Sequence, residues 1–394
     1  LIPYPSSLLG EPIMDFEKLL ADCVDFTQRL IKTPSMTYEE EKIAHLIAEE
    51  MRKLEFEEVW LDEVNNVYGR IYGQDRSLPA LVLNTHTDHV DPGDPALWPV
   101  PPYSGEIVDG RICGRGACDI KGPLAVQIYS MAGLLRGDER PRRDVVFTGV
   151  VEEEIGGTGS LHWVQNLDYP VDLVIVGEPS SNKLSLGHRG IEGYWVQFNG
   201  RSVHASAPGR GENPNYPLAT FLQRLHERQG ELKQHPYLGA TTVAPTIVQV
   251  DTTSTNVTPA WTRVFLDFRT AAESPNSILA FIRDLASDLP YEILPGHPDW
   301  SEMDSDEVLV GFDTNPESET VKRVQAALSK GMGREAVLSS YQFATDGRLF
   351  PPFGLTVLGY APGDETLAHT VKESIAIDEM AEALKGHMQL LREY

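Results

Sequence analysis

Hydrophobic residues recur at helical spacing near the start of the chain and gather in short apolar runs further along. The helical pattern predicts helices over residues 15–31 and 38–54, separated by Thr33-Pro34-Ser35, and another over 124–135. The apolar runs predict strands, namely VWLDEV, NNVYGRIYG, ALVLNTH, DVVFTGVV and DLVIVGEP. Strands that alternate with helices indicate an α/β layer fold whose sheet is at least partly parallel.

From about Gly187 the pattern changes to alternation of apolar and polar residues. The runs GYWVQFNG, TIVQVDTTSTN and WTRVFLDFRT have a period of two, and residues 217–232 and 277–287 have helical spacing. This predicts an α+β block with an antiparallel sheet. After the polar stretch HPDWSEMDSDE, helical patterns and apolar strands resume, as in LTVLGYAPG. We therefore predict an inserted domain, residues 187–300, within a discontinuous domain made of residues 14–186 and 301–394.

The composition excludes several classes of protein. Of 394 residues, 41% are hydrophobic and 23% charged, which is typical of a globular protein, and no apolar run approaches the length of a membrane span. The net charge of −25 argues against a nucleic acid or an anionic membrane as partner. Three cysteines without a C-x-x-C pair indicate a reduced, cytoplasmic protein. Residues 1–13 lack the features of a secretory signal, and we interpret them as a leader or remnant before a native start at Met14.

Acidic and imidazole residues stand at the ends of the apolar runs. In open α/β sheets, ligands bind beyond the carboxyl ends of the strands. Carboxylates and imidazoles together suit borderline divalent metals, zinc above all. The set is too rich for one ion, so it indicates two metal ions with a water between them, the apparatus of hydrolysis. Its members are His86, Asp88, Asp119, Glu153, Glu154, Glu178 and His369.

Each of these motifs has an alternative interpretation when it is taken alone. His86 and Asp88 are also compatible with a satisfied histidine beside a surface carboxylate, and Glu152–Glu154 with a solvated charge run. The glutamate run, however, follows the strand DVVFTGVV and precedes Gly156-Gly157, which places it at a strand-to-turn junction. GRGACDIKG has the spacing of neither common phosphate-binding loop, so a nucleotide-dependent enzyme is disfavoured.

Taken together, the segments resemble the acetylornithine deacetylase, succinyl-diaminopimelate desuccinylase, aminoacylase and carboxypeptidase G family of di-metal hydrolases. The resemblance runs from about Asp15 to the end of the chain, with the motifs in order. THTDHV is similar to G-H-x-D-x-V, GRGACDIKGP to G-R-G-x-x-D-x-K-G, and EEEIGG to D-E-E-x-G. VGEPS contains G-E-P, and AHTVKE is similar to the late histidine motif.

The resemblance implies a role for each residue of the set. Asp119 would bridge two divalent ions, for which Zn²⁺ is the first expectation and Co²⁺ or Mn²⁺ are alternatives. One ion would also bind His86 and Glu178, and the other Glu154 and His369. Asp88 would orient His86, since a carboxylate commonly holds a metal-binding imidazole. Glu153 would be the general base. A cis peptide bond between Asp119 and Ile120 is implied as well.

These roles agree with the chemistry of amide hydrolysis. The reaction needs a nucleophile stronger than neutral water and a group that stabilises the oxyanion. A water bridging two cations roughly 3.5–4 Å apart loses a proton readily, giving a metal-bridged hydroxide. Glu153 would accept that proton and return it to the leaving amine, a role typically worth about 10²–10⁴-fold in rate.

The resemblance also assigns the inserted block as a dimerisation or lid domain, beside a metallopeptidase-like catalytic domain whose mixed sheet is flanked by helices. GRSVHASAP is similar to G-R-x-x-H-x-x-x-P, which makes His204 an oxyanion stabiliser in the partner's site of a homodimer. TNVTP and DFRT, with Asn256 and Arg269, resemble the substrate-binding residues. An arginine fork suits the free α-carboxylate of an N-acyl amino acid. His204 is also compatible with a surface strand end, and Asn256 and Arg269 with ordinary sheet positions.

We therefore expect a metal-dependent hydrolase that cleaves the amide bond of a small N-acyl amino acid. Glutamate at position 178 favours this activity, because the peptidase branches of the family often have aspartate there. A dipeptidase or carboxypeptidase is the alternative, and YQFATDGR departs from the family by having Phe343 and Ala344 where glycines are usual. A catalytically inactive binding protein is a further alternative, disfavoured because every expected ligand is present.

Overall fold

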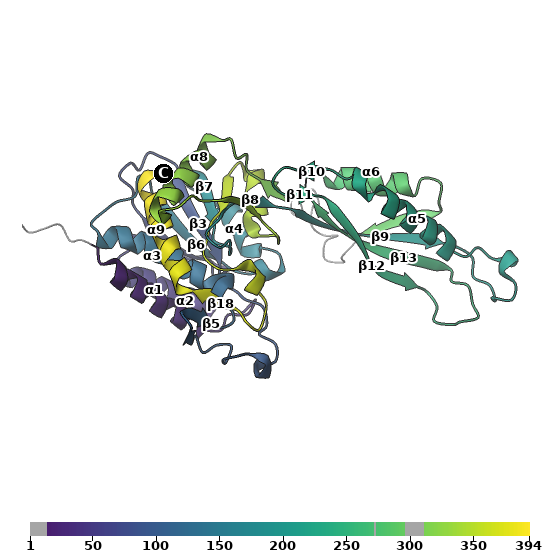
Figure 1. The fold of residues 1–394 in the computed structure, drawn as a ribbon, viewed down its shortest axis with the longest axis horizontal. Coiled ribbons are helices and arrows are strands. Elements are labelled where there is room, and N and C mark those ends of the chain that lie inside the picture. The colour runs from purple at the N-terminus through teal and green to yellow at the C-terminus, as the bar shows by residue number, and fades with distance from the viewer. Residues whose placement is uncertain (1–13, 272, 296–310) are drawn as a thin grey trace, which may run out of the picture. The chain divides into compact units, whose positions relative to one another are not determined.

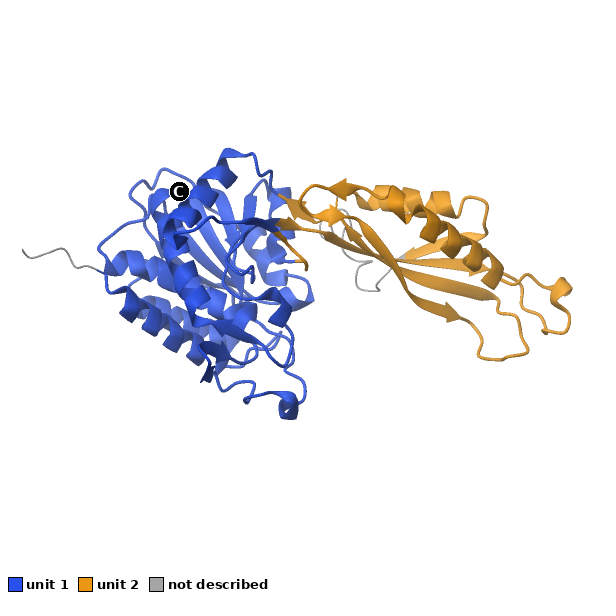
Figure 2. Cartoon of the chain, in the orientation of Figure 1, with its two compact units in different colours: residues 1–186, 314–339, 345–394 blue, residues 187–313, 340–344 orange. Residues whose placement is uncertain are grey.

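The computed structural model describes residues 14–271, 273–295 and 311–394. The interpretation of residues 1–13 as a leader, and the predicted domain junction between residues 300 and 301, therefore lie outside the described residues. The chain divides into two compact units (Figure 2). Unit 1 comprises Leu1–Leu186, Thr314–Ser339 and Thr345–Tyr394, and unit 2 comprises Gly187–Asp313 and Ser340–Ala344.

A mixed sheet forms the centre of unit 1 (Figure 1), with the strand order β1-β2-β6-β3-β7-β17-β8. The four adjacent strands β6, β3, β7 and β17 are parallel, and the remaining strands run antiparallel to their neighbours. β15 (Phe312–Asp313) and β16 (Leu338–Tyr341) also pair with β8. The other strands are β1 (Glu58–Leu61), β2 (Val67–Ile71), β3 (Ala80–His86), β6 (Val145–Val150), β7 (Val171–Val176), β8 (Leu184–His188) and β17 (Thr356–Gly359).

Helices pack their apolar sides against this sheet and form one hydrophobic core with it. β3 and β6 are buried along their whole length, which explains why both read as continuous apolar runs in the sequence. The helices of unit 1 are α1 (Phe16–Ile31), α2 (Glu41–Lys53), α3 (Gly122–Arg136), α4 (Thr158–Gln165), α8 (Glu319–Met332) and α9 (Ile377–Glu393). All of these except α4 contribute residues to the core cluster around β3, β6 and β7.

Local sequence explains where the first helices begin. The Asp15 side chain accepts a hydrogen bond from the N–H of Lys18 at 3.1 Å, and α1 starts at the next residue, as the N-cap preference of aspartate leads one to expect. α2 starts at Glu41 and not at the predicted residue 38. Tyr38 has a φ of 75°, in the left-handed region that a right-handed helix does not contain.

Unit 2 contains an antiparallel sheet of order β12-β13-β9-β14 with two helices against one face. Along β13 every second residue is buried, which is the alternation that the sequence shows. The elements are β9 (Gly190–Asn199), α5 (Asn215–Arg228), β12 (Thr242–Val250), β13 (Trp261–Thr270), α6 (Pro275–Leu285) and β14 (Tyr291–Pro295), with a small hairpin of β10 (Gln234–His235) and β11 (Gly239–Ala240). The strand predicted over TIVQVDTTSTN was wrong beyond Val250, because residues 251–256 form the turn between β12 and β13.

A third, small sheet in unit 1 joins the middle of the chain to its last part. Its order is β18-β5-β4, with β4 (Ile107–Val108), β5 (Arg111–Cys113) and β18 (Ser374–Ala376). Ser374 pairs with Cys113 in the antiparallel register. The residues before Ser374 therefore lie beside the turn that follows Cys113.

Gly159, in the first turn of α4, packs directly on the end of β6. A Cβ atom there would lie 2.5 Å from the backbone nitrogen of Val151 and 2.5 Å from Oδ1 of Asn66. We expect Gly159→Ala to lower the free energy of unfolding by about 2 kcal/mol, because overpacking against backbone outweighs the roughly 1 kcal/mol gained in helix propensity. Urea denaturation measures this. The control is Gly209→Ala, where nothing lies within 4 Å, and equal stability of the two variants would contradict the prediction.

Candidate metal centre

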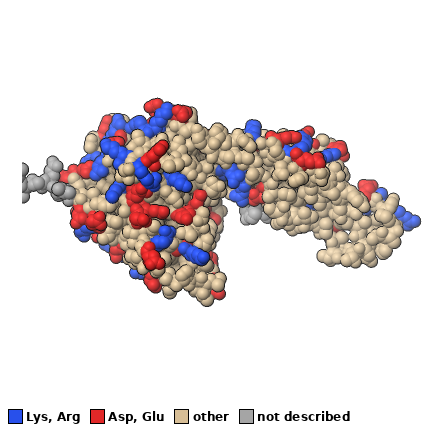
Figure 3. All heavy atoms as spheres, in the orientation of Figure 1, with Lys and Arg blue, Asp and Glu red and all other residues tan. Residues whose placement is uncertain are grey.

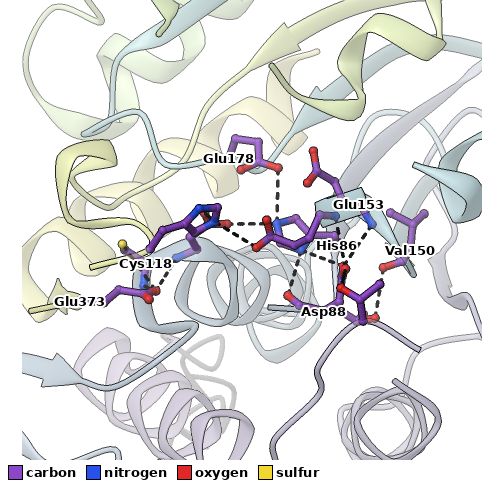
Figure 4. A network of polar contacts seen from close by, with 12 residues as sticks. His86, Asp88, Cys118, Val150, Glu153, Glu178 and Glu373 are labelled. Atoms are coloured by element: carbon purple, nitrogen blue, oxygen red, sulfur yellow. Dashed lines mark hydrogen bonds and ion pairs between the residues drawn. The ribbon is translucent and has the colours of Figure 1, made fainter. Parts of the chain in front are cut away.

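The parallel strands bring three of the predicted site segments to one edge of the sheet. β3 ends at His86, and its parallel neighbours β6 and β7 end at Val150 and Val176. The turn with Glu153 and Glu154 follows β6, and Glu178 follows β7. His86 therefore lies between the glutamate turn on one side and Glu178 on the other (Figure 4).

Asp119 lies between two imidazoles. Its Oδ1 is 3.1 Å from Nε2 of His86, and its Oδ2 is 3.2 Å from Nε2 of His369. Nε2 of His86 is also 3.6 Å from Oε1 of Glu178, and Nε2 of His369 is 3.1 Å from Oε1 of Glu154. The two oxygens of one carboxylate thus face two separate pairs, each made of an imidazole and a glutamate. The Asp119–Ile120 peptide bond is cis, as the resemblance implies.

The donor atoms fit divalent metal ions. Nδ1 of His86 lies 3.0 Å from the carbonyl oxygen of Asp88, which can only accept a hydrogen bond; the neutral tautomer that donates to this carbonyl carries its proton on Nδ1. Nε2 then presents a lone pair to the oxygens of Asp119 and Glu178. Lone pairs facing one another at this distance call for a cation among them. The carboxylates of Asp119 and Glu154, hydrogen-bonded to His369, raise the pKa of that imidazole to about 10, which shows the same demand for positive charge.

Glu153 also lies within ligand distance of His86. Ligand atoms of His86, Glu153 and Glu178 lie within 4.8 Å of one another, as do those of His86, Asp119 and Glu154. In the part of the chain that the structure describes, these are the groups of three or more such side chains that could hold an ion. The assignment of Glu154 as ligand and Glu153 as base therefore stays a prediction.

Asp88 holds the glutamate turn as well as facing His86. Its Oδ1 lies 3.2 Å from Nδ1 of His86 and accepts the backbone N–H of Glu153 at 3.2 Å. Its Oδ2 accepts the N–H of Glu154 at 3.3 Å and the hydroxyl of Thr37 at 2.9 Å. The Asp88 side chain is fully buried. The sequence predicted only the contact with His86, and a role in shaping the turn was missed.

The backbone departs from common conformations at two places in the site. Glu152 has a φ of 58° and His369 a φ of 61°, both in the left-handed region. Non-glycine residues there carry local strain that the surrounding contacts must offset. For Glu152 one such contact is the hydrogen bond from its N–H to Oε1 of the buried Glu40, at 3.1 Å. Glu40 had no place in the sequence analysis, because it lies inside an ordinary helix-start pattern.

The surroundings of Glu153 suit a group that takes up and releases a proton. Burial raises the pKa of its carboxyl well above the usual range, and the negative charges of Asp346 and Glu178 raise it further, whereas His86 opposes them. A carboxyl with a raised pKa is matched to proton transfer near neutral pH. Asp346 comes from the YQFATDGR segment and was given no role in the sequence analysis.

The three predicted site residues of unit 2 do not all lie together. His204 follows β9, with Nδ1 2.8 Å from Oγ of Ser206, and the N–H of Ala205 donates to the carbonyl of Asn256 at 2.8 Å. His204 and Asn256 are therefore neighbours, and both are exposed.

Arg269 lies at the other end of β13. Trp261, at the end near Asn256, pairs with Asn199, whereas Arg269 pairs with Ile191. The strand has ten residues, and at ~3.4 Å per residue its two ends are about 30 Å apart. Nε and Nη2 of Arg269 bind the carboxylate of Asp267 at 2.9 Å and 3.3 Å. Within a single copy of unit 2, the length of β13 therefore separates Arg269 from Asn256, and their roles in substrate binding stay predictions.

Comparison with known proteins decides the family. Residues 82–393 match Peptidase family M20/M25/M40. The chain belongs to this family. A curated relative in Alkalilimnicola ehrlichii, named succinyl-diaminopimelate desuccinylase, is 29% identical over 387 residues, which cover 94% of this chain and 100% of the relative.

Solved structures of this family share the fold. The M20 metallo-carboxypeptidase of Sulfolobus solfataricus has a TM-score of 0.71 at 20% identity, covering 96% of this chain and 99% of its own. A Bacillus subtilis protein, described as a dinuclear metal binding peptidase of the M20 family, has a TM-score of 0.69 at 14% identity, covering 95% of this chain and 98% of its own. The predicted α/β class with a mixed sheet and an added antiparallel sheet is confirmed. As an M20 member, the chain is a metal-dependent hydrolase of amide or peptide bonds.

The neighbouring glutamates of the turn provide a test of the site. If Glu153 is the general base and not a ligand, Glu153→Gln should lower kcat by about 10²–10⁴-fold while two metal ions stay bound. Glu154→Gln should instead release one ion. Metal content per chain, measured by elemental analysis after dialysis, separates the two. Glu152→Gln is the matched control and should retain both ions. Loss of an ion from Glu153→Gln but not from Glu154→Gln would show the two roles to be reversed.

Proposed function

We propose that this chain is a deacylase that cleaves the amide bond of N-acyl amino acids by means of two divalent metal ions. The observation that carries the proposal is the position of Asp119, whose two oxygens face separate imidazole–glutamate pairs, with Glu153 alongside. His86 and Glu178 would hold one ion, His369 and Glu154 the other, and Asp119 both. Zn²⁺ is the preferred ion, and Co²⁺ or Mn²⁺ suit the same donors.

The residues of the chain divide the chemistry between them. When bound, the ions would activate water and stabilise negative charge on the reacting carbonyl. Glu153 would take a proton at its carboxylate and deliver it to the amine that leaves. Asp88 would keep His86 in the tautomer whose Nε2 faces the ion, and would hold the N–H groups of Glu153 and Glu154. A hydrolase of this design leaves an amino acid and a short carboxylate.

The acyl amino acid is supported by two features of the chain. Glutamate at position 178 is typical of the deacylase branches that the sequence resembles, and a relative that covers the chain is named as a desuccinylase. Arg269 would anchor the free α-carboxylate. Nε and Nη2 of Arg269 both donate to the carboxylate of Asp267. These two hydrogen bonds orient the guanidinium so that Nη1 points away from Asp267.

A screen with chelator and metal separates this activity from its alternatives. We expect the protein, stripped with a chelator, to be inactive and to regain N-acetyl or N-succinyl amino acid hydrolysis with about two equivalents of Zn²⁺ per chain. Dipeptides in the same screen test the peptidase alternative. Full activity with a single tightly bound ion would contradict the two-metal site, and no hydrolysis of any substrate would favour a binding protein.

The anchor is tested with esters of the same substrates. Substrates should need the free α-carboxylate, so the methyl ester or amide of an N-acetyl amino acid should have a lower kcat/KM than the acid. In Arg269→Met this difference between the acid and its ester or amide should disappear. A charged hydrogen bond of this type is worth about 1.5–3 kcal/mol, or roughly 10–150-fold in kcat/KM. Equal kcat/KM for acid and ester in the wild-type protein would remove the anchor role.

We further propose that the active species is a homodimer in which His204 stabilises the oxyanion in the partner's site. β12 is an edge strand of the unit 2 sheet, and Ile247, Val248 and Val250 on it are 47%, 57% and 43% exposed. A long apolar edge strand invites pairing with a second copy. Arg269 lies at one end of β13, and His204 and Asn256 lie near the other. This separation supports the dimer, because one small substrate could contact Arg269 of one subunit and His204 and Asn256 of its partner.

The dimer proposal is tested by mixing inactive variants. His204→Ala should lower kcat by about 10²–10³-fold with both ions retained. Mixing it with Glu153→Ala should restore part of the activity, because one site of the heterodimer has both residues intact. The control is a mixture of His204→Ala with Asn256→Ala, which should stay inactive because these neighbours come from the same subunit. Subunit exchange is checked by labelling, and exchange without recovered activity in the first mixture would rule out the trans role.

The surface agrees with a small-molecule substrate. On the face shown in Figure 3, acidic and basic side chains are interspersed over unit 1, with no broad basic area on that face. The described residues include no helix that combines the length and the apolar character needed to cross a membrane. Cys23 and Cys118 are buried free thiols, and Cys113 is half-buried. We propose a cytoplasmic location, in keeping with unpaired cysteines.

A further inference from the structure

Glu373 is a buried carboxylate beside the metal centre that belongs to neither set of proposed ligands. Only 1% of the residue is exposed. Its Oε1 accepts the backbone N–H of Cys118 at 3.2 Å and that of Asp119 at 3.1 Å (Figure 4). Its Oε2 lies 2.5 Å from Nη1 of Arg115. Both oxygens of Glu373 are therefore engaged with the segment that carries the shared aspartate.

The small sheet explains how Glu373 comes to this position. β18 pairs with β5, and the N–H of Gly114 donates to the carbonyl of Glu373 at 3.1 Å. The Arg115 side chain also contacts the loop before Glu373, where its Nη1 donates to the carbonyl of Thr370 at 3.5 Å. Thr370 directly follows His369. Glu373 and Arg115 thus join the turn that carries Asp119 to the loop that carries His369.

The two proposed metal sites differ in what holds their ligands. His86 is the last residue of β3 and Glu178 follows the adjacent strand β7, and the backbone ladder between the two strands sets the separation of these residues. Asp119 lies instead in the short helical turn Ala117–Lys121 that precedes α3, and His369 lies in a loop and is itself about half exposed, at 49% of its side chain. The separation of these two ligands depends on contacts such as those of Glu373.

We propose that Glu373 is a positioning residue that keeps Asp119 and His369 at the spacing required by the second metal ion, the ion that Glu154 also binds. The inference rests on the proposed two-metal function. The proposal follows from the geometry. The Glu373 carboxylate accepts the successive N–H groups of Cys118 and Asp119. Glu373 is also only four residues after His369, and β18, which begins at the next residue, holds its backbone against β5. The first ion, at His86 and Glu178, should depend on Glu373 only through Asp119.

The test compares metal binding in two substitutions at this position. Glu373→Gln keeps an oxygen that can accept both N–H groups but loses the charge pair with Arg115, and Glu373→Met removes the acceptor at similar volume. The control is Glu50→Gln. Glu50 is also a buried glutamate, 5% exposed, bound to an arginine, Arg29, at 2.7 Å and to the hydroxyl of Tyr129 at 2.6 Å, away from the ligand segments.

Metal-free protein is titrated with Zn²⁺ by calorimetry, and with Co²⁺ by absorption spectroscopy to follow coordination at each site. We expect Glu373→Met to lower the affinity for the ion at Glu154 and His369 by about 10–100-fold, the range found when partners that orient metal ligands are removed. The affinity for the other ion should change by less than about threefold. Glu373→Gln should fall between Glu373→Met and wild type, and Glu50→Gln should bind both ions as wild type does.

The outcomes are distinguishable. Wild-type affinity for both ions in Glu373→Met would overturn the positioning role, as would an equal loss of both ions in Glu373→Met and Glu50→Gln, which would indicate general destabilisation. If Glu373→Met does not fold, judged by its unfolding transition, Glu373→Gln decides the matter, since a selective loss of the ion at Glu154 and His369 supports the role and unchanged binding refutes it. A wild-type protein that binds one ion would refute the two-metal function itself.

Discussion

The arrangement of this protein depends on keeping several carboxylates close together despite their mutual repulsion. Five carboxylates lie around the imidazoles of His86 and His369, and most of them have an oxygen close to an imidazole nitrogen or another carboxylate. They are Asp88, Asp119, Glu153, Glu154 and Glu178. Like charges at this spacing disfavour the folded state unless cations or hydrogen-bond donors offset them. Metal ions would supply the positive charge in the centre. Around it, backbone N–H groups of residues 118, 119, 152, 153 and 154 supply the donors.

These N–H groups donate to acids that are not proposed metal ligands, and this has a structural consequence. Glu40, Asp88 and Glu373 each accept N–H groups from the turns that carry the ligands, and all three are almost completely buried. A buried carboxylate that accepts two or three hydrogen bonds is rigidly placed, because each lost bond would leave charge without a partner. The ligand turns are thereby fixed from outside the ring of ligands. This explains how residues with left-handed φ angles, Glu152 and His369, are tolerated there.

The strand-end part of the site was predictable, and the loop part was not. His86 and Glu178 follow continuous apolar runs, and parallel strands of a sheet end at a common edge, so their proximity follows from the pattern alone. The contact of Glu373 with Asp119 joins residues 254 apart in the sequence, and no periodicity indicates it. The resemblance to known hydrolases named His369 and Asp119 without showing what holds them. In unit 2, Thr252, Thr253 and Thr255 favour a strand by their β-branching but lie in the turn after β12. The extended strand β13 then separates Asn256 from Arg269.

The pairing of β18 with β5 also bears on the order in which the protein can mature during synthesis. His86, Asp119, Glu154 and Glu178 all leave the ribosome within the first half of the chain, whereas His369, Glu373 and β18 come near its end. The helices α8 and α9, which contribute to the core around β3 and β7, are also made late. The sheet edge that carries His86 and the Asp119 turn held through β18 therefore reach their final structure only after most of the chain has been synthesised.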